Sequence, residues 1–332
     1  MSDTFEIKKI LNVPLLIMLV GLPGSGKSTY ANTVKIVQIS GEATNPVVHS
    51  SDALREELYG DAAIQGDNGK LFSELHKRIK RDLAAGKDVV YDATNLKKKN
   101  RRQFLSELQS IECYKVCVVF ATTFEACLHN NKQRDRQVPF YVIQKMQKSF
   151  APPHFNEGFD YICSIFTYLG ENGQITHDAP DKGYTIEDFV AQAKDFNQEN
   201  KHHSLTLGEH SYKAYEYIKT RKPKDYALQL AAILHDNGKL YTKTNLNAKG
   251  IDDGDCHYYG HQNVGAYNAM FYADCIGFLP DLMEVSNLIY YHMAPFVEWK
   301  QSERVRKFDK DLLGDELFEK IMLLHEADLA AH

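Results

Sequence analysis

The chain has 332 residues, a length that accommodates two domains of ordinary size. Hydrophobic residues make up 43% and charged residues 25% of the sequence, and both values are typical of a globular protein. The net charge of -5 excludes a surface that is positive throughout, so any contact with nucleic acid must be confined to a local groove.

The cysteine pattern and the N-terminal segment indicate the cellular compartment. Six cysteines include no C-x-x-C pair, which favours reduced thiols over a disulfide framework. Charged residues interrupt the N-terminal segment before any apolar run, so we expect no signal peptide. No apolar run reaches the ~18 residues that a transmembrane helix needs. We therefore expect a cytoplasmic protein with no membrane partner.

A glycine-rich loop at residues 21–28 follows the apolar run 15–20, which predicts a buried strand. The loop fits the pattern G-x-x-x-x-G-K-[ST], in which backbone N–H groups and a helix N-terminus surround a phosphate. Lys27 would reach the β- and γ-phosphates of ATP, and the Ser28 hydroxyl would hold Mg²⁺. The alternative is a glycine-rich turn that binds nothing. The expected nucleotide site consists of Gly21, Leu22, Pro23, Gly24, Ser25, Gly26, Lys27, Ser28 and Thr29.

Residues 47–52 predict a short second strand that ends in polar residues, and Ser51 or Asp52 would cap the helix that follows it. In an open α/β sheet the carboxyl ends of the strands converge on the ligand crevice, so we expect Asp52 near the γ-phosphate. A carboxylate there can accept the proton of an attacking hydroxyl. The alternative is that Asp52 is only a helix cap. Arg55 would position an acceptor phosphate, or it is a solvated surface arginine.

Two further segments add candidate groups to this site. Residues 88–95 predict a buried strand that closes in Asp-x-Thr-Asn, where Asp92 either supports Mg²⁺ or forms an ordinary strand-end hydrogen bond. The basic run 97–102 begins the next helix; it is a solvated helix end or a steering site for a polyanion. After a strand at 115–120, Arg134 and Arg136 fit a lid that closes on the transferring phosphate oxygens.

These motifs resemble the kinase module of the polynucleotide kinase branch of P-loop phosphotransferases. The resemblance rests on residues 21–28, on Ser-Asp-x-x-Arg at 51–55 and on the Arg134/Arg136 segment followed by Val-Pro. It implies a parallel sheet flanked by helices and transfer of the ATP γ-phosphate to a 5′-hydroxyl. Asp52 would activate that hydroxyl and Arg55 would hold an acceptor phosphate, while Arg134 and Arg136 would contact the donor phosphates. Related kinases with the same layout phosphorylate small molecules.

Glycine and proline residues interrupt the segment 166–200, and residues 185–189 predict the start of a connecting helix. We therefore place a P-loop kinase domain at residues 1–165, a connecting segment at 166–200 and a second domain at 201–332. The alternative is that the connecting segment continues the first sheet, through a strand at 161–169.

In the second domain, apolar helices begin or end at histidine or aspartate residues. Imidazole nitrogens and carboxylate oxygens suit hydrolytic metals such as Mn, Fe, Co, Ni or Zn. A bound ion of this kind lowers the pKa of water, so that hydroxide forms near neutral pH. The candidate ligands are His210, His235, Asp236, His261, His292 and Asp328.

The ordered set His210, His235-Asp236 and Asp328 resembles the HD phosphohydrolase superfamily, over about residues 202–332. The resemblance implies an all-α domain in which these four residues bind a metal ion. His261 and His292 match the additional histidines of members that bind a second ion, or they are buried core histidines. The resemblance also places Lys239, one turn after His235, where it would hold a substrate phosphate.

Together, the two resemblances imply an enzyme that heals RNA ends. Ribonuclease cleavage through the 2′-hydroxyl leaves a 5′-hydroxyl and a 2′,3′-cyclic phosphate. The first domain would phosphorylate the 5′-hydroxyl with ATP and Mg²⁺. The second would remove 2′,3′-cyclic, 2′- or 3′-phosphate with one or two divalent ions such as Mn²⁺, Ni²⁺, Co²⁺, Fe²⁺ or Zn²⁺. The substrate would be RNA, or DNA, and a separate RNA ligase would seal the ends, because the sequence has no K-x-D-G ligase signature.

Two other functions fit the same motifs. One is a small-molecule or nucleoside kinase fused to an HD nucleotide phosphohydrolase, which would need a closed acceptor pocket rather than a basic groove leading to Asp52. The other is a non-catalytic protein that uses ATP as a switch. Such a binder should lack Asp52 or part of the histidine and aspartate set, and both are intact.

Overall fold

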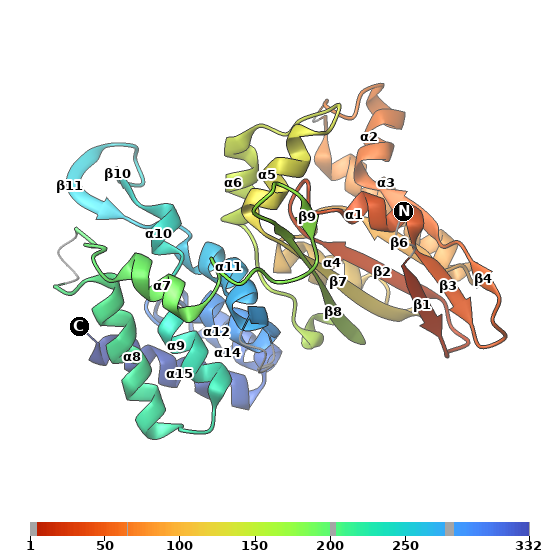
Figure 1. Ribbon diagram of the computed structural model, residues 1–332. Coiled ribbons are helices and arrows are strands. Elements are labelled where there is room, and N and C mark those ends of the chain that lie inside the picture. The colour runs from red at the N-terminus through yellow and green to blue at the C-terminus, as the bar shows by residue number, and fades with distance from the viewer. Residues whose placement is uncertain (1–4, 65, 200–203, 276–281, 332) are drawn as a thin grey trace. The chain divides into compact units, whose positions relative to one another are not determined.

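The computed structural model describes residues 5–64, 66–199, 204–275 and 282–331. It divides into two compact units (Figure 1). The first comprises Met1–Ile143 and Phe155–His177, and the second comprises Gln144–His154 and Asp178–His332.

A six-stranded sheet in the order β5-β6-β2-β7-β8-β9 forms the centre of the first unit. The neighbouring strands β5, β6, β2, β7 and β8 pair in parallel, and β9 pairs antiparallel with β8. Every residue of β2 is buried, as expected for an apolar run between two parallel neighbours. The strands are β2 (Leu15–Val20), β5 (Val47–Ser50), β6 (Val89–Asp92), β7 (Tyr114–Thr122), β8 (Tyr161–Leu169) and β9 (Ile175–Thr176).

Helices connect the parallel strands of this sheet (Figure 1). Helix α3 buries Leu71, Leu75, Ile79 and Leu83, which recur at helical spacing and pack toward β5 and β6. A small three-stranded sheet in the order β1-β3-β4 contains the first strand of the chain. The remaining elements are β1 (Glu6–Lys9), α1 (Lys27–Thr33), β3 (Lys35–Gln38), β4 (Ala43–Thr44), α2 (Ser51–Tyr59), α3 (Asn68–Ala84), α4 (Lys98–Ser106), α5 (Phe124–Lys132), α6 (Phe140–Gln147) and the 3-10 helix η1 (Phe155–Glu157).

The helix at Asp52 begins one residue earlier than the sequence suggests. The sequence predicts Ser51 or Asp52 as the cap, whereas Ser50 occupies the N-cap position with extended backbone and no side-chain cap hydrogen bond. The strand β5 leads directly into α2, so the chain is still extended at Ser50. Asp52 lies inside the first turn instead, where its carboxylate is not used as the cap.

Helices dominate the second unit (Figure 1). The sequence predicts an all-helical domain, whereas the structure adds an antiparallel pair, β10 with β11. A turn at Gly250, with φ of 76°, lets the chain reverse between these strands. The elements are α7 (Ile186–Ala193), α8 (Leu207–Arg221), α9 (Tyr226–Leu234), α10 (Lys239–Thr242), β10 (Thr244–Leu246), β11 (Asp252–His257), α11 (His261–Cys275), α12 (Leu282–Tyr291), α13 (Glu298–Gln301), α14 (Glu303–Leu313) and α15 (Asp315–Ala330).

Two segments fall on the other side of the boundary that the sequence suggests near residue 166. Strand β8 continues to Leu169 and pairs with β9, so residues 166–177 belong to the first unit. This is the alternative that the sequence left open. Conversely, Gln144–His154 packs within the second unit. There Phe150 is fully buried with its ring 5.1 Å from that of Tyr267, and Asn263 Nδ2 donates a 2.8 Å hydrogen bond to the Phe150 carbonyl oxygen.

Two findings bear on the expected compartment. None of the helices in the described part of the chain is long and apolar enough to cross a bilayer. The five cysteines whose side chains the structure describes, Cys113, Cys117, Cys127, Cys163 and Cys256, are free thiols.

Candidate active sites

The glycine-rich loop joins the carboxyl end of β2 to α1, in the middle of the sheet. Gly24 and Gly26 have φ of 80° and 93°, a left-handed conformation that favours glycine. A side chain on Gly24 would also collide with the carbonyl oxygen of Cys127 in α5. Thr122 Oγ1 donates to the Ser25 carbonyl oxygen at 3.0 Å and Asn130 Nδ2 donates to that of Gly24 at 2.9 Å. The neighbouring strand and helix therefore hold the loop in shape.

Lys27 is buried and its ammonium is folded back over the loop. Its Nζ donates to the Leu22 carbonyl oxygen at 2.7 Å and to Ser25 Oγ at 3.1 Å. Burial lowers the pKa of Lys27 to about 8, although Asp92 acts in the opposite direction. Arg134 and Asp52 also act on this ammonium, so the predicted lid and the predicted base lie within its electrostatic reach.

Ser28 and Asp92 form the pair that a magnesium site requires. Ser28 Oγ donates a 2.9 Å hydrogen bond to Asp92 Oδ2, and Asp92 is buried at the end of β6. Hydroxyl and carboxylate oxygens are the ligands that Mg²⁺ prefers, together with water and nucleotide phosphates. These two residues therefore fit the ion that the loop implies.

Asp52 lies among three arginines. Its carboxylate is 3.3 Å from Arg55 Nη1, 3.6 Å from Arg136 Nη1 and 3.9 Å from Arg134 Nη2. The Asp52 side chain is 48% exposed, so a substrate hydroxyl can reach it. Arg55 is buried, and its Nη2 donates to Asn68 Oδ1 at 2.9 Å. Its buried Nε has no hydrogen-bond partner among the described residues.

One asparagine side chain, that of Asn131, forms hydrogen bonds across the segment that carries Arg134 and Arg136. Asn131 Nδ2 donates to the Val138 carbonyl oxygen, and Val138 N donates to Asn131 Oδ1, both at 2.9 Å. The Asn131 side chain therefore fixes both ends of the loop between α5 and α6, and with it the position of the two arginines.

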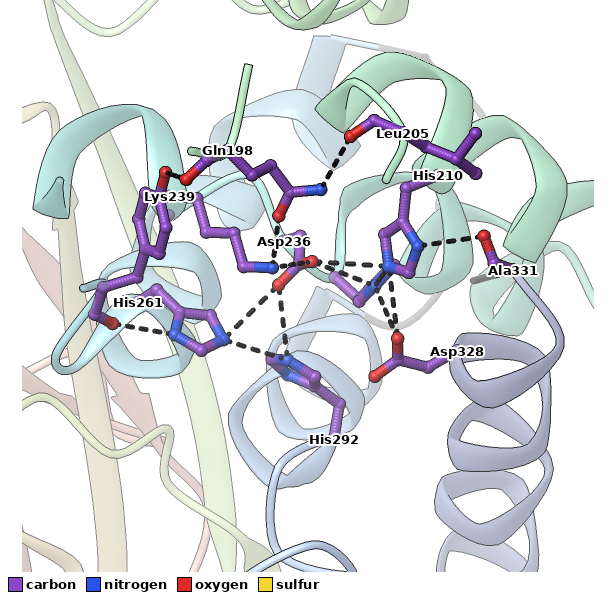
Figure 2. Close-up of polar contacts among 12 residues, drawn as sticks. Gln198, Leu205, His210, Asp236, Lys239, His261, His292, Asp328 and Ala331 are labelled. Carbon is purple, nitrogen blue, oxygen red and sulfur yellow. Dashed lines mark hydrogen bonds and ion pairs between the residues drawn. The ribbon is translucent and has the colours of Figure 1, made fainter. Parts of the chain in front are cut away.

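Six buried residues converge in the second unit (Figure 2). Thr206 and Glu209 form a capping box at the start of α8. Asp225 is the N-cap of α9, and its side chain accepts a hydrogen bond from Leu228 N. These caps fix where each helix places its ligands. His210 lies in α8, His235 and Asp236 follow α9, His261 begins α11, His292 follows α12, and Asp328 lies in α15.

One group of candidate ligands consists of His210, His235 and Asp328, whose ligand atoms are spaced like neighbouring atoms around one ion. His210 Nε2 lies 3.0 Å from His235 Nε2 and 3.1 Å from Asp328 Oδ1, and His235 Nε2 lies 3.8 Å from Asp328 Oδ1. Ligands at about 2.1 Å from a metal are about 3.0 to 3.4 Å apart in octahedral or tetrahedral geometry. The group therefore fits a metal ion with little adjustment.

A second group of three lies beside the first. His261 Nε2 is 3.2 Å from His292 Nε2 and 3.4 Å from Asp236 Oδ1, and His292 Nε2 is 3.7 Å from the same oxygen. The other Asp236 oxygen, Oδ2, lies 3.5 Å from His210 Nε2 and 3.4 Å from His235 Nε2. In Figure 2 this carboxylate lies between the two groups, so it can bridge two ions.

The four imidazole rings are oriented for metal binding. The Nδ1 atom of each ring faces a backbone carbonyl oxygen, which favours the tautomer that leaves an Nε2 lone pair for the metal. Two Nε2 lone pairs only 3.0 Å or 3.2 Å apart repel each other unless a cation or a proton lies between them. The carbonyl partners are those of Ala331 for His210, Ala232 for His235, Tyr258 for His261 and Ile289 for His292.

The carboxylates of this site are ionised and His261 is neutral. Burial alone would raise the pKa of Asp236, but the Lys239 ammonium and His235 hold it well below its usual range. Burial likewise opposes ionisation of Asp328, but its hydrogen bond with His210 holds the pKa well below the usual value. Burial lowers the pKa of His261 to about 3. Negative carboxylates and neutral imidazoles are the forms that bind metal.

The structure also assembles residues that the sequence does not single out. Asn130 and Thr122 hold the phosphate loop, and Asn131 clamps the lid segment. Gln198, in the expected connecting segment, accepts a 2.7 Å hydrogen bond from Lys239 Nζ. Neutral amides and hydroxyls carry no distinctive spacing, so no sequence signal separates them from ordinary polar residues. Arg101 lies in the basic run but is buried in an ion pair with Glu157 rather than solvated.

A comparison with protein families matches the N-terminal part of the chain. The family model for an AAA domain matches residues 16–153. An L-seryl-tRNA(Sec) kinase of Methanococcus maripaludis is 26% identical over 152 residues, covering 44% of this chain and 56% of the relative. A bifunctional polynucleotide phosphatase/kinase of Schizosaccharomyces pombe is 26% identical over 155 residues, covering 45% of this chain and 33% of the relative.

Among solved structures, a gluconokinase from Sinorhizobium meliloti aligns with a TM-score of 0.33 and 18% identity, covering 47% of this chain and 84% of that one. The chain spans about half of one curated relative described above and a third of the other. The N-terminal region is therefore similar to a P-loop AAA domain, and the curated relatives described above that share this similarity include kinases.

Proposed function

We propose that the protein is a bifunctional enzyme that heals broken RNA ends. The first unit phosphorylates 5′-hydroxyl ends with ATP, and the second removes 2′,3′-cyclic, 2′- or 3′-phosphate. The observation that carries the proposal is the presence, in one chain, of Asp52 among three arginines and of Asp236 between two histidine groups.

In the kinase reaction, each part of the first site has one task. When bound, Mg²⁺ neutralises charge on the donor phosphates, and Ser28 and Asp92 are the residues that would hold it. Asp52 accepts the proton of the attacking 5′-hydroxyl. Arg134 and Arg136 turn from Asp52 to the phosphate oxygens and stabilise the charge that develops there. Arg55, whose Nη1 lies beside Asp52, holds a phosphate of the acceptor strand.

In the second unit, His210, His235 and Asp328 would hold one divalent ion, and Asp236, His261 and His292 would hold a second. When bound, such ions supply a hydroxide nucleophile at neutral pH. The chain itself orients the ligands through the backbone carbonyl groups that face each Nδ1 atom. Lys239, 2.7 Å from Asp236 Oδ2, supplies a positive charge for a substrate phosphate.

The two activities complement each other chemically. Cleavage through the 2′-hydroxyl leaves a 5′ end without a phosphate. The other strand then ends in a 2′,3′-cyclic phosphate instead of a free 3′-hydroxyl. The proposed kinase corrects the first end and the proposed phosphohydrolase corrects the second. A separate ligase then seals the strand, and the relative named a polynucleotide phosphatase/kinase supports this substrate class.

The kinase proposal is tested by comparing acceptors. The protein is incubated with ATP, Mg²⁺ and either a 5′-hydroxyl oligoribonucleotide, the matching DNA, nucleosides or sugar acids. We expect the oligoribonucleotide to have the highest kcat/KM. Phosphorylation of nucleosides or sugar acids in preference to both polynucleotides would contradict the proposal.

The phosphohydrolase proposal is tested by metal reconstitution. Metal-free protein is loaded separately with Mn²⁺, Ni²⁺, Co²⁺, Fe²⁺ or Zn²⁺ and incubated with RNA that ends in a 2′,3′-cyclic phosphate or a 3′-phosphate. We expect phosphate release with at least one of these ions and none after chelation. A protein that binds these ions but leaves both ends intact would contradict the proposal.

A further inference from the structure

Gln198 belongs to the metal pocket, although it lies in the segment that the sequence suggests is a connector. Its side chain is fully buried, and its Oε1 accepts a 2.7 Å hydrogen bond from Lys239 Nζ. The same ammonium lies 2.7 Å from Asp236 Oδ2. In Figure 2 the Lys239 ammonium lies between two acceptors. The neutral amide of Gln198 is on one side and the Asp236 carboxylate is on the other.

The backbone around Gln198 is fixed at several points. Tyr258 OH donates a 2.6 Å hydrogen bond to the Gln198 carbonyl oxygen. The backbone N–H of Cys256 donates a 3.0 Å hydrogen bond to the Glu199 carbonyl oxygen. Lys243 Nζ forms a 2.8 Å ion pair with Glu199. Gln198 Nε2 contacts the Leu205 carbonyl oxygen at 3.4 Å. The amide is therefore held in one orientation, with its oxygen toward Lys239.

The anionic acceptor is one that a metal ion would also use. Asp236 Oδ2 lies within 3.5 Å of His210 Nε2 and His235 Nε2, so an ion bound by these histidines would bind this oxygen as well. A divalent ion and an ammonium at the same oxygen repel each other. With the ion in place, the amide oxygen of Gln198 is an acceptor that can still hold the Lys239 ammonium near the pocket.

We propose that Gln198 is a positioning residue that keeps the Lys239 ammonium beside the metal ions, where it binds the phosphate group of the substrate. The inference rests on the function proposed above for the second unit. Gln198 does not touch the reacting atoms in this account and acts only through Lys239. Its loss should therefore weaken phosphate binding more than it slows the chemical step.

The test compares Gln198→Met with Gln192→Met in the metal-loaded full-length protein. Methionine has a similar length but no acceptor for the ammonium. Gln192 is an exposed glutamine of α7 and serves as the matched control. Inorganic phosphate is the probe, and its affinity is measured by calorimetry beside the bound metal content and the KM and kcat for RNA with a 3′-phosphate.

For Gln198→Met we expect about tenfold weaker phosphate binding and a KM raised by about the same factor, because one hydrogen bond to a charged group is lost. We expect kcat within about threefold of wild type and an unchanged metal content. In a Lys239→Met background, Gln198→Met should have no further effect on phosphate affinity, because both residues act through one ammonium. Gln192→Met should behave as wild type.

Unchanged phosphate affinity in Gln198→Met would overturn the proposal, and so would an additive loss in the Lys239→Met background. Loss of metal in Gln198→Met would also overturn it, because the residue would then support the ligands rather than the ammonium. Wild-type protein that binds metal and phosphate but hydrolyses no RNA end would contradict the RNA function alone. The role of Gln198 would still be decided by the phosphate affinities.

Discussion

Ser28 and Asp92 are 64 positions apart in the sequence, and the hydrogen bond between them links the phosphate loop to the neighbouring strand. The sequence left Asp92 with two readings, an ion support or an ordinary strand-end residue. A contact at 2.9 Å from the serine that ends the loop motif favours the first. Residue types and spacing predict the loop itself, but only the sheet order, which is non-local, brings Asp92 to it.

Removal of either partner should weaken the use of magnesium. We expect Ser28→Ala and Asp92→Asn each to lower the kinase kcat/KM by about 100-fold, and the double variant to be little worse than either, because both act on one ion. Steady-state kinetics over a range of Mg²⁺ concentrations measures this effect. Thr33→Ala, at a half-buried threonine at the other end of the same helix, is the control. Fully additive losses would show that the two residues do not share an ion.

The lowered pKa of Lys27 makes ATP binding dependent on pH. Because burial lowers this pKa to about 8, the free protein loses the proton as the pH rises through that value. Bound phosphates favour the charged form and raise the pKa again. At about pH 8.5 ATP binding should therefore take up a proton, which calorimetry in two buffers of different ionisation enthalpy detects. Lys27→Arg, which stays charged, should take up none. A wild-type enthalpy that is independent of the buffer would contradict the assignment.

The helices of the second unit meet through a close approach at Gly238, which caps α10. A side chain there would collide with the carbonyl oxygen of His261 and lie 2.7 Å from Gly265 N, at the start of α11. The φ of Gly238 is -64°, so the constraint is space rather than backbone strain. The glycine after His-Asp-Asn therefore lets α11 bring His261 to its ligand position.

A methyl group at this glycine should disturb the second ligand group. We expect Gly238→Ala to cost about 1–3 kcal/mol of stability through overpacking and to lower the number of bound metal ions. Denaturant unfolding and elemental analysis measure the two effects. Gly170→Ala is the control, because a side chain there meets its nearest atom at 3.4 Å. Wild-type stability and metal content in Gly238→Ala would show that the helices adjust without loss.

A buried ion pair between Arg101 and Glu157 links α4 to η1 within the first unit. Arg101 Nε and Nη2 donate to the two Glu157 oxygens at 2.8 Å and 2.7 Å, and both side chains are fully buried. The sequence predicts the run 97–102 as a solvated helix end or a steering site. It cannot show that Glu157 lies opposite, because that contact joins residues far apart in the chain.

Breaking this pair should be costly, because one buried charge loses its partner. We expect Arg101→Met to lower the free energy of unfolding by about 3–5 kcal/mol. Lys99→Met, at an exposed position of the same run, should change it by less than about 0.5 kcal/mol. Denaturant unfolding of both variants tests the difference. Equal effects of the two substitutions would show that the run behaves as one solvated surface.

At the scale of the whole molecule, local signals predict more than long-range ones. The strand at 15–20 has the bounds that the sequence indicates, because it is an apolar run that ends at the glycine-rich loop. The strand expected at 47–52 ends earlier, at Ser50, because α2 begins at Ser51. The sequence also singles out the six residues that converge in the second unit, because histidine and aspartate at helix ends are distinctive. Gln198 and the packing of Gln144–His154 could not be predicted, since both depend on contacts with segments more than 40 positions away.

The two candidate sites lie in different compact units and share no residue. The proposed enzyme should therefore lose its activities one at a time. Asp52 belongs to the first candidate site, and Asp236 is buried among the candidate ligands of the second. Substitution of each by asparagine keeps the shape of the side chain and removes only its charge.

The most direct test follows both ends of one oligoribonucleotide that carries a 5′-hydroxyl and a 3′-phosphate, incubated with ATP, Mg²⁺ and Mn²⁺. Wild-type protein should convert it to a 5′-phosphate and a 3′-hydroxyl. Asp52→Asn should leave the 5′ end unchanged while the 3′-phosphate is removed, and Asp236→Asn should give the reverse. A wild-type protein that changes neither end, or a single substitution that abolishes both reactions, would contradict the account.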